Sequence, residues 1–317
     1  MVFQAGKPVR FFGRGKGKII IEFNNQNYEK DILTEKWVVE LPKQNYGGPF
    51  DINVNLDGKK KLLRNVAFGD VYLCAGQSNM QFTIDEEVNT STILSDNKIR
   101  YFVSDRIEEH NGLKSTDGWQ ICEKDKVGGW SALGLHIAQL QRKNKDVFVG
   151  IVGCFQGASV IQSWMPERKI DESVEVSEGA RHGDKTDRLY SQWNGDTALY
   201  KKTFLPIVPF AFNTIIWYQG ESNTSIAEGK VYTELLSRMI DAWREDLLDN
   251  DLPFVIIEIS DFDVRNDDGW KAIQRSQQEI QYIKSNVKTV TSKDVCESWQ
   301  IHPGNKEKLA KKIVNVL

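Results

Sequence analysis

The chain has 317 residues, of which 40% are hydrophobic and 27% charged, with a formal net charge of −3. This balance excludes the strongly basic composition of proteins that bind nucleic acids or anionic membranes. No apolar stretch approaches the roughly 18 residues of a membrane span, and no signal peptide opens the sequence, so we expect a cytoplasmic protein unless a leader is missing from it. A chain of this length can form one large core, or a core domain with a smaller module.

The first 66 residues have the pattern of a small all-β module. Their apolar residues fall in short β-branched or alternating runs, separated by Gly, Asn and Pro clusters that are typical of turns. The runs are KIIIEF (18–23), KWVVEL (36–41) and DINVNL (51–56). We therefore predict an antiparallel, β-sandwich-like module over residues 1–66.

From residue 67 onward, predicted strands alternate with predicted helices. Four apolar runs are typical of strands buried on both faces: VYLCA (71–75), VFVGIV (147–152), FNTIIWY (212–218) and PFVIIEI (253–259). Helical spacing of apolar residues predicts helices over 131–143, 231–247, 270–283 and 305–317. Such alternation predicts an α/β domain over residues 67–317, with a parallel sheet covered by helices on both faces. The polar stretch 166–196 has no period and is either a substrate loop or a solvated insertion.

The cysteines and histidines limit the chemistry that the chain can perform. The four cysteines form no CxxC pair, and two of them lie in or beside apolar strands, which indicates free buried thiols. No HxH or HExxH spacing occurs, so we expect no bound metal. Of the four histidines, His136 falls in an amphipathic helix, where we expect a structural role. His110 and His182 fall in charged loops, which leaves His302 as the candidate base.

Glycine and small polar residues follow three of the predicted strands. Ser78 follows the first in GDVYLCAGQSNM (69–80), GCFQGASVIQSWM (153–165) follows the second, and WYQGESN (217–223) closes the third. Carboxyl ends of parallel strands share one edge of a sheet, and His302 precedes the last predicted helix, so these segments can meet. A serine nucleophile needs a base, and donors for the oxyanion that forms when it attacks a carbonyl. Each segment alone is more typical of a turn or helix cap, but their combination favours a catalytic site.

The blocks GDVYLCAGQSNM, IIWYQGESN and IHPGNK occur in this order along the chain. They resemble the nucleophile, third and histidine blocks of the Ser-Gly-Asn-His (SGNH) hydrolases, and within these the sialate O-acetylesterase-like carbohydrate esterases. Upstream, MVFQAGKPV and KWVVELPKQNYGGPFDINV resemble parts of the β-domain that precedes the catalytic domain, and LYKKTFLPIVPF resembles a segment before the third block. The resemblance implies a three-layer α/β/α, flavodoxin-like SGNH hydrolase domain with a parallel sheet, behind a small N-terminal β-sandwich-like module.

The resemblance also implies a role for each site residue. Ser78 would be the nucleophile, and His302 the general base that later protonates the leaving alcohol. The backbone N–H of Ser78, the backbone N–H of Gly157 and the side chain of Asn223 would form the oxyanion hole. The reaction would be acyl transfer through an acyl-enzyme, which releases acetate from a sugar hydroxyl. The family needs no metal and no organic cofactor for this reaction.

Two positions depart from the family pattern. The second block reads FQGA (155–158) where the family often has Trp-Gly-Gly-Thr. Many SGNH enzymes place an aspartate two or three residues before the histidine, and here those positions are Gln300 and Trp299. Glu297 could orient His302 instead. A Ser-His dyad is the alternative, with the imidazole held by a backbone carbonyl or by Gln300, because the third member of a triad mainly orients the base.

The sequence leaves the substrate open among sialic acid acetyl esters, acetylated xylan and another acetylated glycan. The β-module stretch favours the sialate type. The missing aspartate motivates a different hypothesis, a non-catalytic glycan-binding protein on an esterase scaffold, against which Ser78, Asn223 and His302 argue. The expected partner is an acetylated sugar, with no nucleic acid and no membrane, and the pattern predicts no particular oligomeric state.

Overall fold

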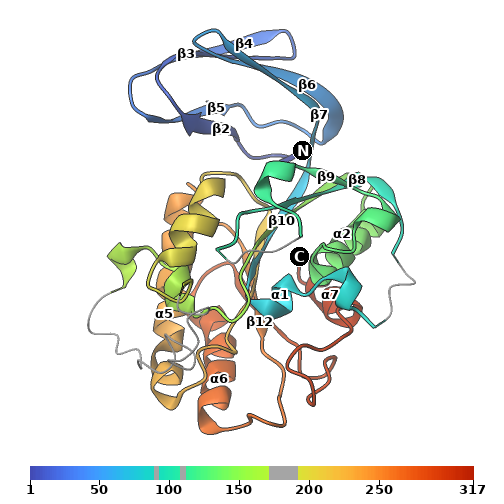
Figure 1. Ribbon diagram of the computed structural model, residues 1–317, viewed down its shortest axis with the longest axis vertical. Coiled ribbons are helices and arrows are strands. Elements are labelled where there is room, and N and C mark those ends of the chain that lie inside the picture. The colour runs from blue at the N-terminus through green and yellow to red at the C-terminus, as the bar shows by residue number, and fades with distance from the viewer. Residues whose placement is uncertain (89–92, 108–111, 171–191) are drawn as a thin grey trace.

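The computed structural model describes residues 1–88, 93–107, 112–170 and 192–317. It has a β-rich module stacked on an α/β unit (Figure 1). The module contains β1 (Val2–Gln4), β2 (Val9–Arg14), β3 (Gly17–Phe23), β4 (Gln26–Ile32), β5 (Lys36–Leu41) and β6 (Gly47–Leu56). β2 pairs with β5, and β3 pairs with β4 and β6, all antiparallel, which confirms the three strands expected here.

One long strand, β7 (Lys59–Gly76), connects the module to the α/β unit. Its first part pairs antiparallel with β6, and its last part pairs parallel with two strands of the central sheet. The predicted boundary between residues 66 and 67 therefore falls inside an unbroken strand rather than in a linker. Because β7 runs from the module toward its carboxyl end at Gly76, the module lies at the opposite end of the sheet from α1 (Ser78–Gln81), as Figure 1 shows.

The central sheet has the order β13-β12-β11-β7-β10-β8, with all of these strands parallel and β9 antiparallel at the edge. Their bounds are β8 (Asp96–Val103), β9 (Gln120–Cys122), β10 (Phe148–Phe155), β11 (Thr214–Tyr218), β12 (Phe254–Glu258) and β13 (Val287–Thr291). The run β10-β7-β11-β12-β13 is the 2-1-3-4-5 order of flavodoxin-like sheets, with β8 added outside it. The predicted parallel sheet is confirmed, and β8, β9 and β13 are strands that the sequence did not indicate.

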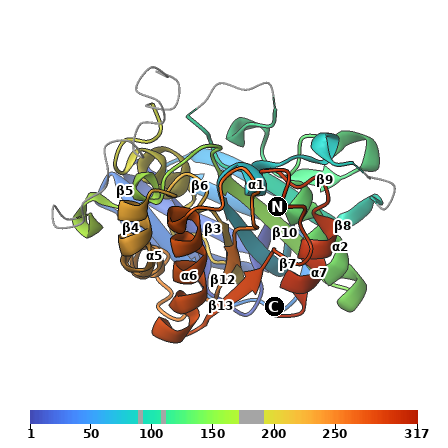
Figure 2. The ribbon, with the colours of Figure 1, turned by 90° about the horizontal axis from the view of Figure 1, so that it is seen from below.

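Helices cover both faces of this sheet, as predicted. The helices are α1 (Ser78–Gln81), α2 (Ala132–Asn144), α5 (Ile226–Asp246), α6 (Asp268–Ile283) and α7 (Glu307–Val314). Figure 2 shows α2 and α7 together on one side of the sheet and α5 with α6 on the other. The last helix is shorter at both ends than the predicted 305–317. Short helical turns lie in the loops, at Ile84–Glu86, Ser115–Asp117, Lys124–Lys126, Ile161–Trp164, Glu167–Lys169, Tyr200–Phe204 and Leu205–Ile207.

The core follows from the apolar runs of the sequence. Every residue of β10, β11 and β12 is buried, as expected for parallel strands with helices on both faces. All four cysteines are free and three of them are buried, which agrees with the predicted free thiols. None of the helices in the described part of the chain is long and apolar enough to cross a membrane. Most of the polar stretch 166–196, and both His110 and His182, lie outside the described residues.

Candidate active site

Three strand ends meet where the sequence predicts the site. Gly76 ends β7 with a φ of +138°, and a Cβ at this position would lie 2.0 Å from the carbonyl oxygen of Tyr218. The next residue, Gln77, donates its backbone N–H to that same oxygen at 2.9 Å. Gln156, after β10, donates its N–H to the Gly76 carbonyl at 3.1 Å. The loops after β7, β10 and β11 are thus joined at the carboxyl edge of the sheet, where open α/β sheets bind their ligands.

Ser78 and His302 lie together at this edge. His302 Nε2 is 2.8 Å from Ser78 Oγ, within hydrogen-bond distance. Ser78 is the first residue of α1, and its backbone N–H has no hydrogen-bond partner among the residues that the structure describes. The serine therefore has an imidazole nitrogen on its hydroxyl and an unoccupied N–H beside it, the two features that acyl transfer to a serine needs.

Hydrogen bonds hold the loop that carries His302 against the segment after α1. Glu87 accepts a hydrogen bond from the backbone N–H of Lys306 at 2.8 Å, and Val88 donates its N–H to the carbonyl of Gly304 at 3.1 Å. The other carboxylate oxygen of Glu87 lies 2.8 Å from His136 Nε2 in α2, and both side chains are buried. His136 thus has the structural role that the sequence predicted.

A buried cluster links Ser78 and His302 through their chain neighbours. Asn79 donates one amide hydrogen to Glu221 Oε1 at 2.6 Å and the other to the carbonyl oxygen of Ile301 at 2.9 Å. Lys306 Nζ donates to the remaining atom of this carboxamide, Asn79 Oδ1, at 2.7 Å. We call Asn79, Glu221, Lys306 and the Ile301 carbonyl the Asn79 clamp. The three side chains are 2%, 7% and 0% exposed, respectively.

Burial shifts the pKa values of the titratable groups in and beside this cluster. Burial raises the pKa of Glu221, while the hydrogen bond from Asn79 and the charge of Lys306 oppose the shift. Burial lowers the pKa of Lys306 to about 8, although Cys296 and the surrounding glutamates favour its charged form. The pKa of His302 is lowered first by its partial burial and then by the positive charge of Lys306, with Glu86 acting in the opposite direction. Partial burial and Lys306 thus both favour the neutral, basic form of the imidazole.

Gly157, which the sequence indicated as an oxyanion donor, lies beside Ser78. A Cβ at Gly157 would be 3.7 Å from Ser78 Cβ, an ordinary van der Waals distance. The backbone N–H of Gly157, however, already donates to the side-chain oxygen of Gln81 at 2.8 Å. A substrate oxygen that used this N–H would have to replace the carboxamide of Gln81.

Asn223 is placed differently from the prediction. Its side chain is fully buried, and its two amide hydrogens are donated to Gln162 Oε1 at 3.1 Å and to Glu228 Oε1 at 2.8 Å. Its oxygen accepts the backbone N–H of Ile161 at 2.9 Å. The carboxamide thus joins the loops after β10 and β11 to the start of α5, and the structure does not direct it at Ser78.

Glu297 and Gln300 do not hold the imidazole in this structure. Within the described ranges, no hydrogen bond joins Nδ1 of His302 to either residue or to a backbone carbonyl. One carboxylate oxygen of Glu297 is buried without a hydrogen-bond partner. The contact nearest to His302 in the chain is instead made by its preceding residue. The carbonyl of Ile301 accepts a hydrogen bond from Asn79.

The model of a carbohydrate esterase family, described as sialic acid-specific acetylesterase, matches residues 68–311. The chain belongs to this family. It is 24% identical over 331 residues to the sialate O-acetylesterase of Mus musculus, covering 86% of this chain and 61% of that protein. It is 23% identical over 312 residues to the human sialate O-acetylesterase, covering 87% of this chain and 59% of that protein. The chain thus spans about three fifths of the length of these curated relatives.

Solved structures show the same fold for this member of the family. A carbohydrate acetylesterase from Xanthomonas citri superposes with a TM-score of 0.82 at 24% sequence identity, covering 98% of this chain and 70% of that one. A protein from Arabidopsis thaliana superposes with a TM-score of 0.50 at 17% identity, covering 78% of this chain and 97% of that one. The match covers nearly the whole chain, β-module included, so the expected fold class is confirmed.

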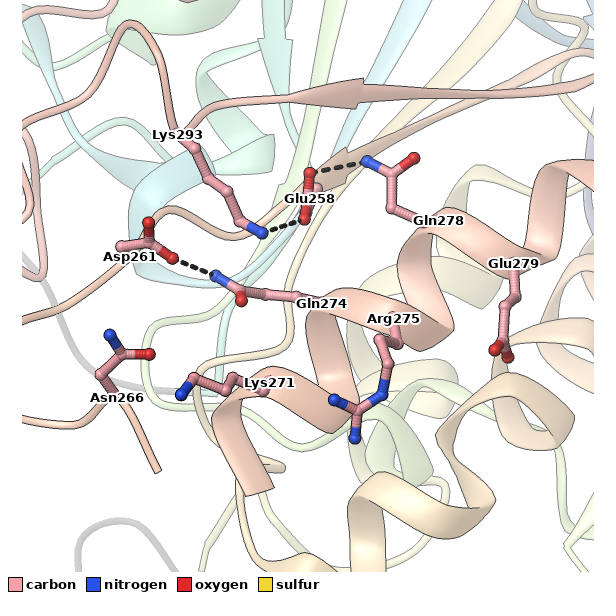
Figure 3. Close-up of a pocket in the computed structure, with 9 residues that line it drawn as sticks. All are labelled: Glu258, Asp261, Asn266, Lys271, Gln274, Arg275, Gln278, Glu279 and Lys293. Carbon is pink, nitrogen blue, oxygen red and sulfur yellow. Dashed lines mark hydrogen bonds and ion pairs between the residues drawn. The ribbon is translucent and has the colours of Figure 1, made fainter. Parts of the chain in front are cut away.

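A separate cavity of about 570 Å³ lies along α6, and its lining residues belong to none of the sequence blocks (Figure 3). Glu258 there is paired with Lys293 at 2.6 Å, and Gln274 donates to Asp261 at 3.0 Å. The lining has equal numbers of acidic and basic side chains: Glu258, Asp261 and Glu279 against Lys271, Arg275 and Lys293. The charges of the lining therefore balance, and none of the residues that line this cavity belongs to the Ser78 site.

Sequence reasoning did not assign a role to Asn79, Gln81 or Lys306. Asn79 lies inside the block that contains Ser78, and Lys306 ends the block IHPGNK, but the blocks indicated no function for either residue. The chain neighbours of Lys306 are Asn305 and Glu307, so the sequence gives no signal of its burial, which depends on how two distant loops pack. Glu221 lies in the block WYQGESN and accepts a hydrogen bond from Asn79.

Proposed function

We propose that this chain is a serine esterase that removes O-acetyl groups from carbohydrates through an acyl-enzyme. The observation that carries the proposal is the 2.8 Å distance between His302 Nε2 and Ser78 Oγ at the carboxyl edge of the sheet. Membership of the carbohydrate esterase family supports the choice of an acetyl ester as the bond that is cleaved.

The reaction would proceed in two acyl transfers. Ser78 Oγ attacks the acetyl carbonyl carbon while His302 Nε2 takes the hydroxyl proton. The tetrahedral intermediate collapses as His302 returns this proton to the sugar oxygen, which leaves as an alcohol. Water then attacks the acetyl-serine ester with His302 again as base, and this step releases acetate and restores Ser78. The lowered pKa of His302 supports its service as a base near neutral pH.

For the oxyanion hole we retain the three donors that the resemblance implied, with unequal support. The unpartnered N–H of Ser78 supports its part most directly. Gly157 lies close enough to serve once the carboxamide of Gln81 moves away from its N–H. Asn223 would have to give up a hydrogen bond to Gln162 or Glu228 before it could donate to substrate.

We propose an acetylated sialic acid as the substrate, because the matched family is described by it and the mouse and human relatives are named sialate O-acetylesterases. Acetylated xylan or another acetylated glycan is the second candidate. A non-catalytic glycan-binding protein is the third, and the absence of a partner on Nδ1 of His302, among the described residues, is the observation that favours it.

Acetate release from p-nitrophenyl acetate tests the reaction, with Ser78→Ala as the control. We expect turnover by the wild type and loss of at least about 10³-fold in the variant, because the nucleophile is removed. Equal inertness of both proteins would refute the esterase and leave the binding protein. A panel of O-acetylated sialic acids and acetylated xylo-oligosaccharides, compared by kcat/KM, then identifies the substrate class.

A further inference from the structure

We propose that Asn79, Glu221 and Lys306 are positioning residues that hold His302 on Ser78 in place of the third carboxylate of a triad. This inference rests on the proposed esterase function. It concerns residues that touch neither the substrate nor the reacting atoms, and that act through the backbone on either side of the reacting pair.

The clamp is attached to the immediate neighbours of both reacting residues. Asn79 directly follows Ser78, and the Ile301 carbonyl directly precedes His302, so the 2.9 Å bond from Asn79 Nδ2 to that carbonyl links the two backbones one residue from each side chain. A triad carboxylate instead fixes the imidazole through Nδ1. Here the peptide that carries the imidazole is fixed, and this restricts where the ring can lie relative to the hydroxyl.

Every atom of the Asn79 carboxamide that can form a hydrogen bond is used. Its two hydrogens go to Glu221 and Ile301, and its oxygen accepts from Lys306. The carboxamide therefore cannot rotate or flip without breaking hydrogen bonds in a buried site, where an unsatisfied polar group is costly. Glu221 belongs to the loop after β11, so the clamp also fixes the nucleophile turn against the neighbouring strand.

Lys306 adds a charge to this geometry. Its ammonium lies 4.6 Å from the centre of the Phe82 ring and 5.9 Å from that of Tyr218, so aromatic faces support it on two sides. A triad aspartate stabilises the imidazolium, whereas a nearby ammonium disfavours it. The clamp therefore combines a fixed position of the imidazole with a bias toward its neutral form. The other charged group that acts on His302 is Glu86, whose effect is opposite.

The decisive experiment uses an isosteric change that breaks two of the clamp bonds. Asn79→Asp keeps the oxygen that accepts from Lys306 but replaces the donor to Glu221 and Ile301 with an acceptor. Adding Glu221→Gln supplies an amide donor and restores the bond between positions 79 and 221 with reversed polarity, while the bond to Ile301 stays broken. Glu221→Gln alone is the matched control, because its amide oxygen can still accept from Asn79.

We expect Asn79→Asp to lower both the melting temperature and kcat on p-nitrophenyl acetate. The double variant should recover most of the melting temperature, with kcat still about 10- to 100-fold below wild type and KM within about twofold, because misplacement of a catalytic group affects the chemical step. Glu221→Gln alone should retain kcat within about threefold. Recovery of kcat together with stability in the double variant would overturn the proposal, since the Ile301 bond would then have no role in turnover.

A second measurement remains decisive if Asn79→Asp does not fold. Lys306→Met removes the charge and the donor, and Lys306→Arg keeps both. We expect Lys306→Met to raise the pKa of His302 in an NMR titration of the imidazole and to lower kcat, and Lys306→Arg to restore both partly. Arg244→Met is the control, because Arg244 is also a buried cation but donates to the carbonyls of Leu252 and Ser285.

The outcomes separate this proposal from the proposed function. An unchanged His302 pKa and kcat in Lys306→Met, or an equal fall of kcat in Arg244→Met, would refute the positioning role while the wild type still hydrolyses the ester. A wild type that is inert on every ester would refute the esterase. The NMR titration of His302 would then still report whether Lys306 acts on the imidazole, because it does not depend on turnover.

Discussion

His302 Nε2 lies 2.8 Å from Ser78 Oγ although 224 residues separate the two in sequence. In the described part of the chain, no carboxylate accepts a hydrogen bond from Nδ1 of this histidine. The contact is made by the packing of two loops, which Asn79 joins through the carbonyl of Ile301. This is the geometry that we expect if the site is a Ser-His dyad whose base is oriented through its backbone, as proposed above.

The pH dependence of turnover should reflect the depressed pKa of His302. Activity requires the neutral imidazole and therefore rises with pH through this pKa. Since partial burial and Lys306 lower the pKa, we expect the acid limb of kcat/KM to lie below about pH 6.5, the ordinary value for histidine. An acid limb above pH 6.5 would contradict this. It would mean that an acidic group raises the pKa of His302 by more than burial and Lys306 lower it. The profile is measured with a neutral acetyl ester at constant ionic strength.

Glu297→Gln should leave turnover close to wild type, within about twofold, because no hydrogen bond connects this carboxylate to His302 in the structure. The change keeps the size of the side chain and removes only its charge. Steady-state kinetics on p-nitrophenyl acetate provide the measurement. A loss of 10³-fold or more, on the order seen when a triad acid is removed, would restore the Glu297 triad.

Asn223→Ala should act mainly on stability. The substitution leaves the Oε1 atom of Glu228 and the N–H of Ile161 without their hydrogen-bond partner, at a cost of roughly 1–3 kcal/mol for each group. We expect a clear fall in melting temperature, with less than about tenfold loss of kcat well below it. A loss of about 10²- to 10³-fold at an unchanged melting temperature is instead the mark of an oxyanion donor, and would support the role that the resemblance implied.

Gly76→Ala should disrupt the nucleophile turn. The new Cβ would lie 2.0 Å from the carbonyl oxygen of Tyr218, and the φ of +138° is rare for any residue with a side chain. Gly129→Ala is the matched control, because nothing lies within 4 Å of its Cβ position. Thermal unfolding should show a large loss for the first variant and none for the second. An equal melting temperature for both would mean that the β7 to α1 turn adapts more freely than its contacts indicate.

Trp299→Ala should weaken the binding of carbohydrate esters. Trp299 is 65% exposed and lies three residues before His302, so its ring is available to pack against a sugar. We expect KM for an acetylated oligosaccharide to rise about tenfold, with little change for p-nitrophenyl acetate, which has no sugar ring. A parallel loss on both esters would show that the indole supports the histidine loop instead of the substrate.

The central strands were predictable because burial on both faces leaves an uninterrupted apolar run, as in VYLCA of β7 and TIIWY of β11. β8 (DNKIRYFV) and β13 (VKTVT) were not predicted, because buried and partly exposed residues are mixed along each strand. A half-polar strand near the edge of a parallel sheet has no apolar run long enough for its sequence to be distinguished from that of a loop. The predicted boundary at residue 66 likewise fell within β7, because composition changes there while the backbone continues as one strand.

For the site, the sequence blocks led to Ser78 and His302, which lie together, and to Gly157, which lies beside them. The direction of the Asn223 carboxamide could not be predicted, because it depends on Gln162 and Glu228, which come from two other segments. The contacts of Asn79 depend in the same way on loops distant in sequence. Motifs indicate which residues are candidates, and the packing of loops decides which atoms they meet.

The bonds of the Asn79 clamp also bear on the order of events in folding. They join residues separated by 142, 222 and 227 positions, so they can form only after the strands between them have assembled. Contacts between such distant segments form slowly, because a long stretch of chain must be ordered first. During refolding from denaturant, helical signal and tryptophan burial should therefore return before esterase turnover, which would report the final docking of the carboxyl-terminal loop.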